Sequence, residues 1–195
     1  GEALLESTVA EAVTGACLLL RREWIERATH LAWVISSPSG PAVAELRRVA
    51  ADASLGGTLA GAGGRVMLHV GDGDSRLGPM RAALEGTELP PTVFYPTHVN
   101  RNRALLEQAI AFAREGGYID ITASTTPELV EAGDIPALVA LELALAEGVP
   151  PSQLTLSSDA GGSLPVYVDG ELTGLTAARP GILLQTLQQA ITEAP

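Results

Sequence analysis

The sequence of 195 residues contains no lysine, so all twelve of its basic residues are arginine. It has a single cysteine, Cys17, which excludes an internal disulfide and is typical of a reducing compartment. Because Cys17 lies beside three leucines, we interpret it as a small buried hydrophobic residue. The formal net charge of −11 argues against nucleic acids and anionic membranes as partners, because no basic face can outweigh it.

Long apolar runs are also missing. The apolar stretches have the length of strands or are broken by Gly, Arg and Pro, so no transmembrane helix is predicted. The first residues lack the basic start and the cleavage site of a signal peptide, and we therefore expect a cytoplasmic protein. With 46% hydrophobic and 18% charged residues, the chain is expected to fold, as one domain over residues 1–195. Since it begins at Gly1 rather than Met, we expect a partial chain.

Strand-like and helix-like segments alternate about five times, which is typical of a parallel α/β architecture. Strand-like runs are expected at residues 29–36, 66–73, 92–102, 118–125 and 154–163. Helical spacing is expected at residues 41–57, 77–87, 102–117, 134–149 and 181–194, whereas 1–28 cannot be assigned. A complete barrel of eight units has about 250 residues. Five units therefore predict either an open doubly wound sheet or the later part of a barrel.

Local signals set some of the boundaries. Gly56 and Gly57 are expected to end the first helix, and Asn102 is expected to cap the third. The Asp169-Gly170 pair predicts a turn between two short extended pieces.

Polar residues able to do chemistry follow several of the apolar runs. In a parallel barrel the carboxyl ends of the strands converge on one face, where catalytic residues lie. His69 and His98 come from consecutive runs and are candidate metal ligands, although a lone histidine is more often a core residue. Arg101 is suited to gripping a carboxylate, or is a solvated surface charge. This pattern predicts a metal-dependent hydrolase.

Asp159 and Ser163 belong to the segment SSDAGGS, whose small residues leave room for a ligand. Asp159 could accept a proton from metal-activated water and pass it to a leaving amine, or it could form a simple Asx turn. Ser163 could bind a substrate carboxylate, although a turn serine is the usual explanation. We interpret Asp72 and Asp74 as a polar loop, and we expect Asp120 to hydrogen-bond within the barrel.

The segments VMLHVGDGDSRLGPMRAALEG, PTHVNRN and LTLSSDAGGSLP make the chain resemble isoaspartyl dipeptidase (β-aspartyl peptidase) over residues 56–175. This family is a branch of the amidohydrolase superfamily. The resemblance implies a zinc-dependent TIM barrel, of which this α/β chain is the carboxyl-side part with about five βα units. It also implies hydrolysis of isoaspartyl dipeptides by a metal-activated hydroxide. The partner is then a small dipeptide substrate, and we expect a homo-oligomer in the intact form.

Carried over by position, the resemblance assigns His69 and His98 as ligands of the second of two zinc ions. It assigns Asp159 as a ligand of the first zinc and as the catalytic proton carrier. Arg101 and Ser163 match residues that bind substrate carboxylates. Three features of the family are missing: a His-x-His pair, the lysine whose carbamate bridges the metals, replaced by Ala32, and a second arginine, replaced by Ser39.

These differences leave three hypotheses. The first is part of an isoaspartyl dipeptidase whose activity is impaired in this chain. The second is a non-catalytic remnant, or a binding or oligomerisation module. The third is a one-metal amidohydrolase that uses His69, His98 and Asp159 on another amide or on a lactone.

Overall fold

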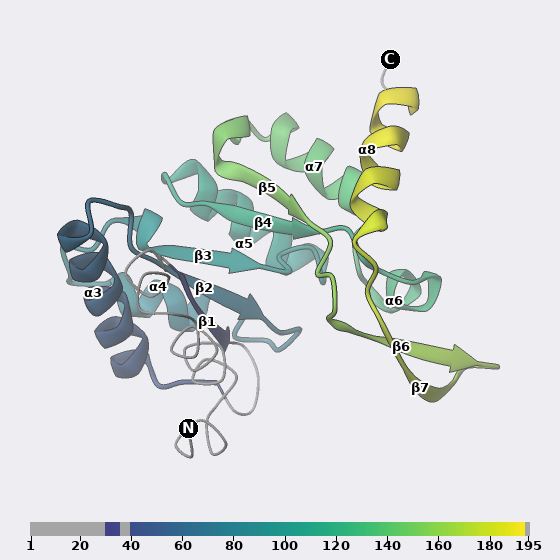
Figure 1. Cartoon of the computed structure of the whole chain (residues 1–195), viewed down its shortest axis with the longest axis horizontal. Coiled ribbons are helices and arrows are strands. Elements are labelled where there is room, and N and C mark those ends of the chain that lie inside the picture. Colours follow the sequence, from purple (N-terminus) through teal and green to yellow (C-terminus); the bar gives the residue numbers. More distant parts are fainter. Residues whose placement is uncertain (1–29, 36–39, 194–195) are drawn as a thin grey trace.

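The computed structural model describes residues 30–35 and 40–193, and shows parallel strands flanked by helices (Figure 1). Cys17 and the unassigned residues 1–28 lie outside the described residues. The first five strands are parallel within two sheets, β1-β2-β3 and β4-β5, and the last two form an antiparallel hairpin. The strands are β1 (His30–Ile35), β2 (Arg65–Val70), β3 (Phe94–Thr97), β4 (Ile119–Thr122), β5 (Leu154–Ser157), β6 (Ser163–Val168) and β7 (Glu171–Ala177).

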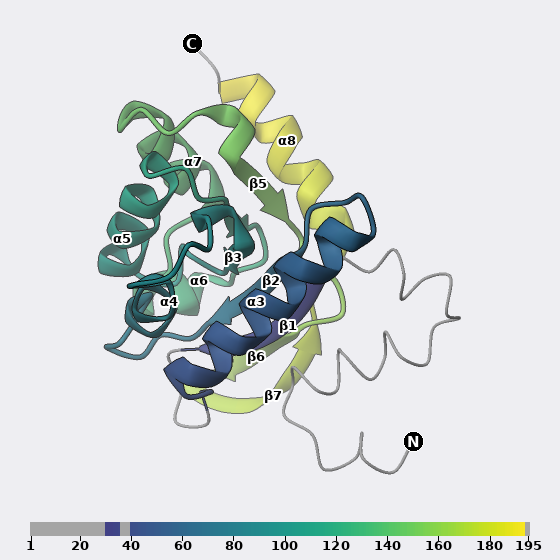
Figure 2. The same ribbon diagram turned by 90° about the vertical axis from the view of Figure 1, so that its left-hand side faces the viewer.

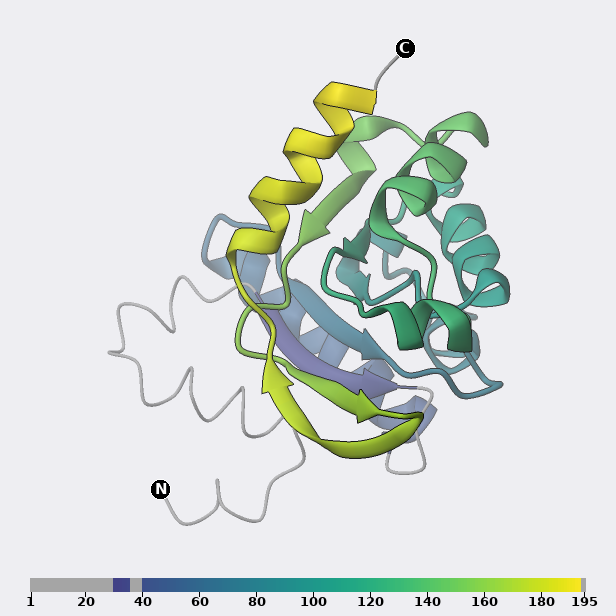
Figure 3. The same ribbon diagram turned by 90° about the vertical axis from the view of Figure 1, so that its right-hand side faces the viewer.

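Helices connect the parallel strands. Figure 2 shows α3 alongside β1 and β2, and Figure 3 shows the hairpin β6–β7 below α8. The helices are α3 (Val43–Leu59), α4 (Gly78–Leu84), α5 (Arg103–Arg114), α6 (Pro127–Ala132), α7 (Ala137–Ala146) and α8 (Gly181–Glu193), with the 3₁₀ helices η2 (Pro91–Val93) and η3 (Pro151–Gln153). The α/β class is confirmed, and the described strands do not form a closed barrel.

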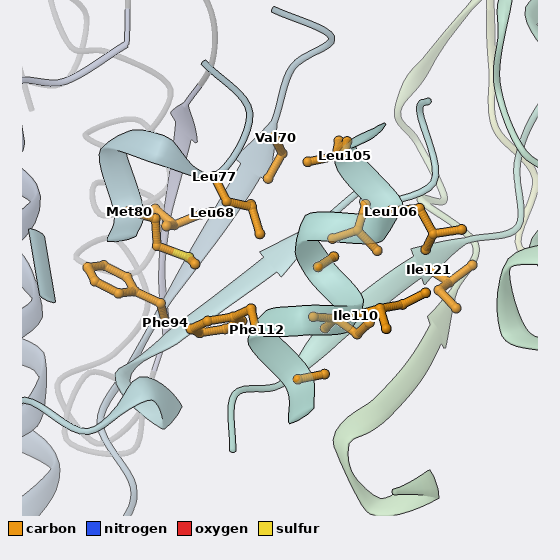
Figure 4. Close-up of a cluster of buried hydrophobic side chains, with 14 of the residues drawn as sticks. Leu68, Val70, Leu77, Met80, Phe94, Leu105, Leu106, Ile110, Phe112 and Ile121 are labelled. Carbon is orange, nitrogen blue, oxygen red and sulfur yellow. The ribbon is translucent and has the colours of Figure 1, made fainter. Parts of the chain in front are cut away.

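Strands β4 and β5 alternate apolar and polar residues, and β2 alternates buried and partly buried side chains. On β2, Val66, Leu68 and Val70 are buried, whereas the intervening side chains are only partly buried. The buried face packs against α4 and α5 in one core (Figure 4). Labelled core residues in that view are Leu68, Val70, Leu77, Met80, Phe94, Leu105, Leu106, Ile110, Phe112 and Ile121. The opposite face carries the polar side chains, including that of His69.

Several predicted boundaries are confirmed. The side chain of Asn102 accepts a hydrogen bond from the Leu105 backbone N–H at 2.9 Å and so caps α5. Asp169 (φ 53°) and Gly170 (φ 82°) form the predicted turn between β6 and β7. Short helix α6 was not predicted from the sequence.

The predicted end of α3 is wrong, because the helix continues through Gly56 and Gly57 to Leu59. Gly57 has a packing role: a Cβ there would lie 2.0 Å from the backbone N of Gly64. Gly64 in turn lies so close to Ala53 that a Cβ would be 1.6 Å from its carbonyl oxygen. These glycines let the start of β2 cross the helix closely instead of ending the helix. Within the described residues, no helix is long and apolar enough to cross a membrane.

Candidate active site at the carboxyl ends of the strands

The two candidate histidines are brought together by the neighbouring strands β2 and β3. His69 is the last but one residue of β2, and His98 directly follows β3. The Nδ1 of His69 lies 2.9 Å from the Nε2 of His98, and the ring centroids are 5.0 Å apart. The convergence expected from strand order is therefore present for this pair.

The position of His98 is held by its backbone and by β4. Its φ of 63° lies in the left-handed region, which non-glycine residues adopt uncommonly. Its Nδ1 is 2.7 Å from the Oγ1 of Thr122, the last residue of β4. With Nδ1 bound to Thr122, the Nε2 of His98 is left to face His69.

Burial favours the neutral form of both rings. It lowers the pKa of His98 to about 3, with the Arg101 guanidinium and His69 acting in the same direction. It also lowers the pKa of His69, an effect that Arg101 reinforces and that Asp159 and Asp120 oppose. Both imidazoles are therefore uncharged at neutral pH, which is the form that binds metal ions.

Asp159 lies two residues beyond β5 in a tight turn. Its φ is 49°, and its carbonyl accepts a hydrogen bond from the Gly162 N–H at 2.8 Å. A Cβ on Gly162 would lie 2.4 Å from the Oδ2 of Asp159. We predicted that the small residues here make room for a ligand, but the room at Gly162 is taken by the Asp159 carboxylate itself.

A single cavity of about 190 Å³ collects most of the candidate residues. His98, Arg101, Asp159 and Ser163 all line it, and His69 contacts His98 without lining the cavity itself. The Arg101 side chain is exposed, and no described residue hydrogen-bonds to its guanidinium. With Asp134 also in its lining, the cavity offers an exposed cation, two carboxyl groups and a hydroxyl beside a neutral imidazole, a combination suited to binding a zwitterionic substrate.

Sequence reasoning gave no role to three further residues around this cavity: Asn100, Thr122 and Asp134. The buried Asn100 amide donates to the carbonyls of Thr122 and Ile135 at 3.0 and 2.8 Å, and its Oδ1 accepts from the Thr122 N–H at 2.9 Å. The sequence signal that could have indicated a role for Asn100 is its position within the segment PTHVNRN, beside His98 and Arg101. Asp134 accepts from the Thr125 hydroxyl, and burial raises its pKa.

Zinc takes four ligands in a tetrahedral arrangement, at least three of them from the protein in most sites. Two imidazole nitrogens converge here, and the second nitrogen of His98 is oriented by Thr122, as is common for metal-binding histidines. Among the described residues, no three His, Cys, Asp or Glu side chains form a group that could hold a metal. The residues therefore fit two ligands of one ion, and they do not fit a complete site.

Parallel strands connected by helices, with polar groups gathered beyond their carboxyl ends, place the chain among α/β proteins. No family model matches it. Among solved structures it is similar to the β-aspartyl dipeptidase of the thermophilic, keratin-degrading Fervidobacterium islandicum AW-1, crystallised in complex with a β-Asp-Leu dipeptide. That match has 34% identity and a TM-score of 0.71, and covers 83% of this chain and 42% of the other.

A second structure of β-aspartyl dipeptidase from the same organism matches with 30% identity and a TM-score of 0.67, covering 83% of this chain and 40% of that one. The resemblance to isoaspartyl dipeptidase is thus confirmed. The chain spans less than half the length of these relatives, so it corresponds to part of such a protein.

Proposed function

We propose that this chain carries the substrate-binding and proton-transferring part of a zinc-dependent isoaspartyl dipeptidase, with activity impaired because the metal site is incomplete. The observation that carries the proposal is the single cavity shared by His98, Arg101, Asp159 and Ser163. The crystallised relative was bound to a β-Asp-Leu dipeptide, which supports a β-aspartyl dipeptide as the substrate here.

In this proposal the chain's own residues have separate roles. The exposed Arg101 guanidinium binds a substrate carboxylate, and the Ser163 hydroxyl donates a hydrogen bond to it. Asp159 lies on the same cavity and holds the proton that the departing amine must receive when the amide breaks. By the resemblance, His69 and His98 would be ligands of one zinc ion, and Asp159 would be a ligand of the other. A bound zinc ion would polarise the carbonyl and make water nucleophilic at neutral pH.

Calorimetric titration of the chain with β-Asp-Leu, with and without added zinc, tests this proposal. We expect binding of β-Asp-Leu and weaker binding of its α-linked isomer. We also expect Arg101→Ala to weaken binding about tenfold or more, because a charge-assisted contact contributes about 1.5–3 kcal/mol.

Arg103→Ala is the matched control. Arg103 lies two residues away and is exposed, but its guanidinium pairs with Glu107 at 2.8 Å on the surface of α5. The Arg103→Ala variant should bind the dipeptide with the same affinity as the unmodified chain. Equal affinities of the Arg101 and Arg103 variants, or no preference for the β-linked dipeptide, would contradict the assigned clamp.

A non-catalytic binding module is the second candidate, favoured by the lack of a three-ligand group among the described residues. Asp159→Asn separates the two. The enzyme hypothesis is supported if, with zinc present, the unmodified chain slowly releases leucine from β-Asp-Leu. Asp159→Asn should then release none, while its unfolding transition stays unchanged. If binding persists in both proteins and neither releases leucine, the binding module is correct. Release of product only from other amides or lactones would favour the one-metal amidohydrolase.

A further inference from the structure

The boundary between β3 and β4 has few backbone hydrogen bonds. The two strands belong to different sheets, and among the described residues a backbone hydrogen bond to β4 comes from the loop after β3, from the Val99 N–H to the Asp120 carbonyl at 3.4 Å. The candidate site nevertheless spans this boundary, because His98 follows β3 and Asp159 follows β5. Side chains must therefore hold the strand ends at a fixed separation.

Asp120 on β4 lies at the centre of those side-chain contacts. It is 3% exposed, and its Oδ2 accepts hydrogen bonds from Thr97 at 2.6 Å and from Ser157 at 2.5 Å. Its Oδ1 accepts from Thr155 at 2.6 Å, and the Thr155 hydroxyl also contacts that of Tyr95. One carboxylate oxygen thus joins the last residue of β3 to the last residue of β5.

Holding three strands together through a buried carboxylate costs free energy. Burial opposes its charge and raises the pKa of Asp120, although the surrounding hydroxyls act in the opposite direction. Apolar residues of similar volume would often give equal or greater stability at such a position. What the carboxylate supplies beyond stability is direction, since each hydroxyl must point at one of two fixed oxygens.

We propose that Asp120 is a positioning residue of the candidate site, fixing the separation of His98 and Asp159 through Thr97 and Ser157. Thr97 directly precedes His98, and Ser157 precedes Asp159 by two residues. The functional meaning of this role rests on the proposed function, whereas the geometry can be tested without activity.

The test compares three variants that each remove one donor to the same carboxylate. Thr97→Val and Ser157→Ala remove the two donors at the strand ends, and Thr155→Val removes the donor farther from the site. Each should lower the free energy of unfolding to a similar extent. The site is followed by NMR through the ring N–H shared by His69 and His98, a signal made simple to assign by the chain's three histidines.

Thr97→Val and Ser157→Ala should increase the solvent exchange rate of that N–H about tenfold beyond what lost global stability explains, as for a weakened hydrogen bond. Thr155→Val should add no such excess, and Thr97→Ser, which keeps the hydroxyl, should restore the original rate. If all three variants change exchange only in proportion to unfolding, Asp120 is a structural residue and the proposal fails. If the dipeptide does not bind but the excess exchange is still observed, the result counts against the proposed function and not against the positioning role of Asp120.

Discussion

Acidification should destabilise this chain through His98. The ring is 6% exposed, and burial lowers its pKa from 6.5 to about 3. The folded chain therefore holds His98 neutral at pH values where the unfolded chain would protonate it. Between these two values the unfolded state binds more protons, so stability falls as the pH falls. Well above pH 6.5, where both states hold His98 neutral, its contribution no longer changes with pH.

The size of the effect follows from linkage. Each pH unit well between the two pKa values costs somewhat more than about 1 kcal/mol, so lowering the pH from 6.5 to 4.5 costs about 2 kcal/mol through His98. A domain of ordinary stability has only about 5–15 kcal/mol to lose. The lowered pKa of His69 acts in the same direction.

Urea unfolding at pH 7.0, 5.5 and 4.5 measures this loss, with His98→Gln as the comparison. Glutamine is neutral at every pH and carries an amide toward Thr122 and His69. The variant should be less stable at pH 7.0 but should lose about 2–3 kcal/mol less than the unmodified chain on acidification. Parallel pH profiles for the two proteins would refute the reasoning, as would an NMR titration in which His98 protonates near pH 6.5 in the folded state.

Three other substitutions test the packing and the site. Gly162→Ala would place a Cβ 2.4 Å from the Asp159 carboxylate, so the carboxylate must move. If the proposed binding site is correct, the affinity for β-Asp-Leu measured by calorimetry should fall about tenfold. Phe112→Ala removes a buried ring from the core and should cost about 3–5 kcal/mol in urea unfolding, whereas a cost below 1 kcal/mol would show that the core closes around the space. Asn102→Ala removes the cap of α5 and should cost about 1 kcal/mol, with Asn102→Asp retaining most of the stability.

Much of the fold was accessible from the sequence because its local signals are strong. The stripe Leu105, Leu106, Ala109, Ile110 and Ala113 is buried as its spacing predicts. Gly56 and Gly57 misled the prediction because a glycine that ends a helix and a glycine that lets another segment approach it look alike in one sequence. Only the contact with Gly64, made by a later segment, separates the two cases.

The candidate residues of the site could be predicted from the sequence, whereas the residues that hold them in position could not. His69 and His98 could be placed together because consecutive parallel strands end at the same edge of a sheet. Asn100 and Thr122 support His98 through contacts between residues more than twenty positions apart, which no local pattern reveals. Among the described residues Asp159 does not form a three-ligand metal group with the histidines, a matter of side-chain geometry that strand order does not determine.

The two faces of the parallel strands explain why this site can be studied separately from folding. Core residues such as Leu68 and Ile121 lie on the helix-covered face, where each buried apolar side chain contributes about 1.5–3 kcal/mol. The opposite face carries His69, Thr97 and Asp120. A neutral hydrogen bond there contributes about 0.5–1.5 kcal/mol net, and one to the carboxylate about 1.5–3 kcal/mol, which is offset by the cost of burying that carboxylate. Folding therefore depends mainly on the first face. The polar groups of the second face are poorly explained by stability alone, which is the physical reason for interpreting them as the framework of a site.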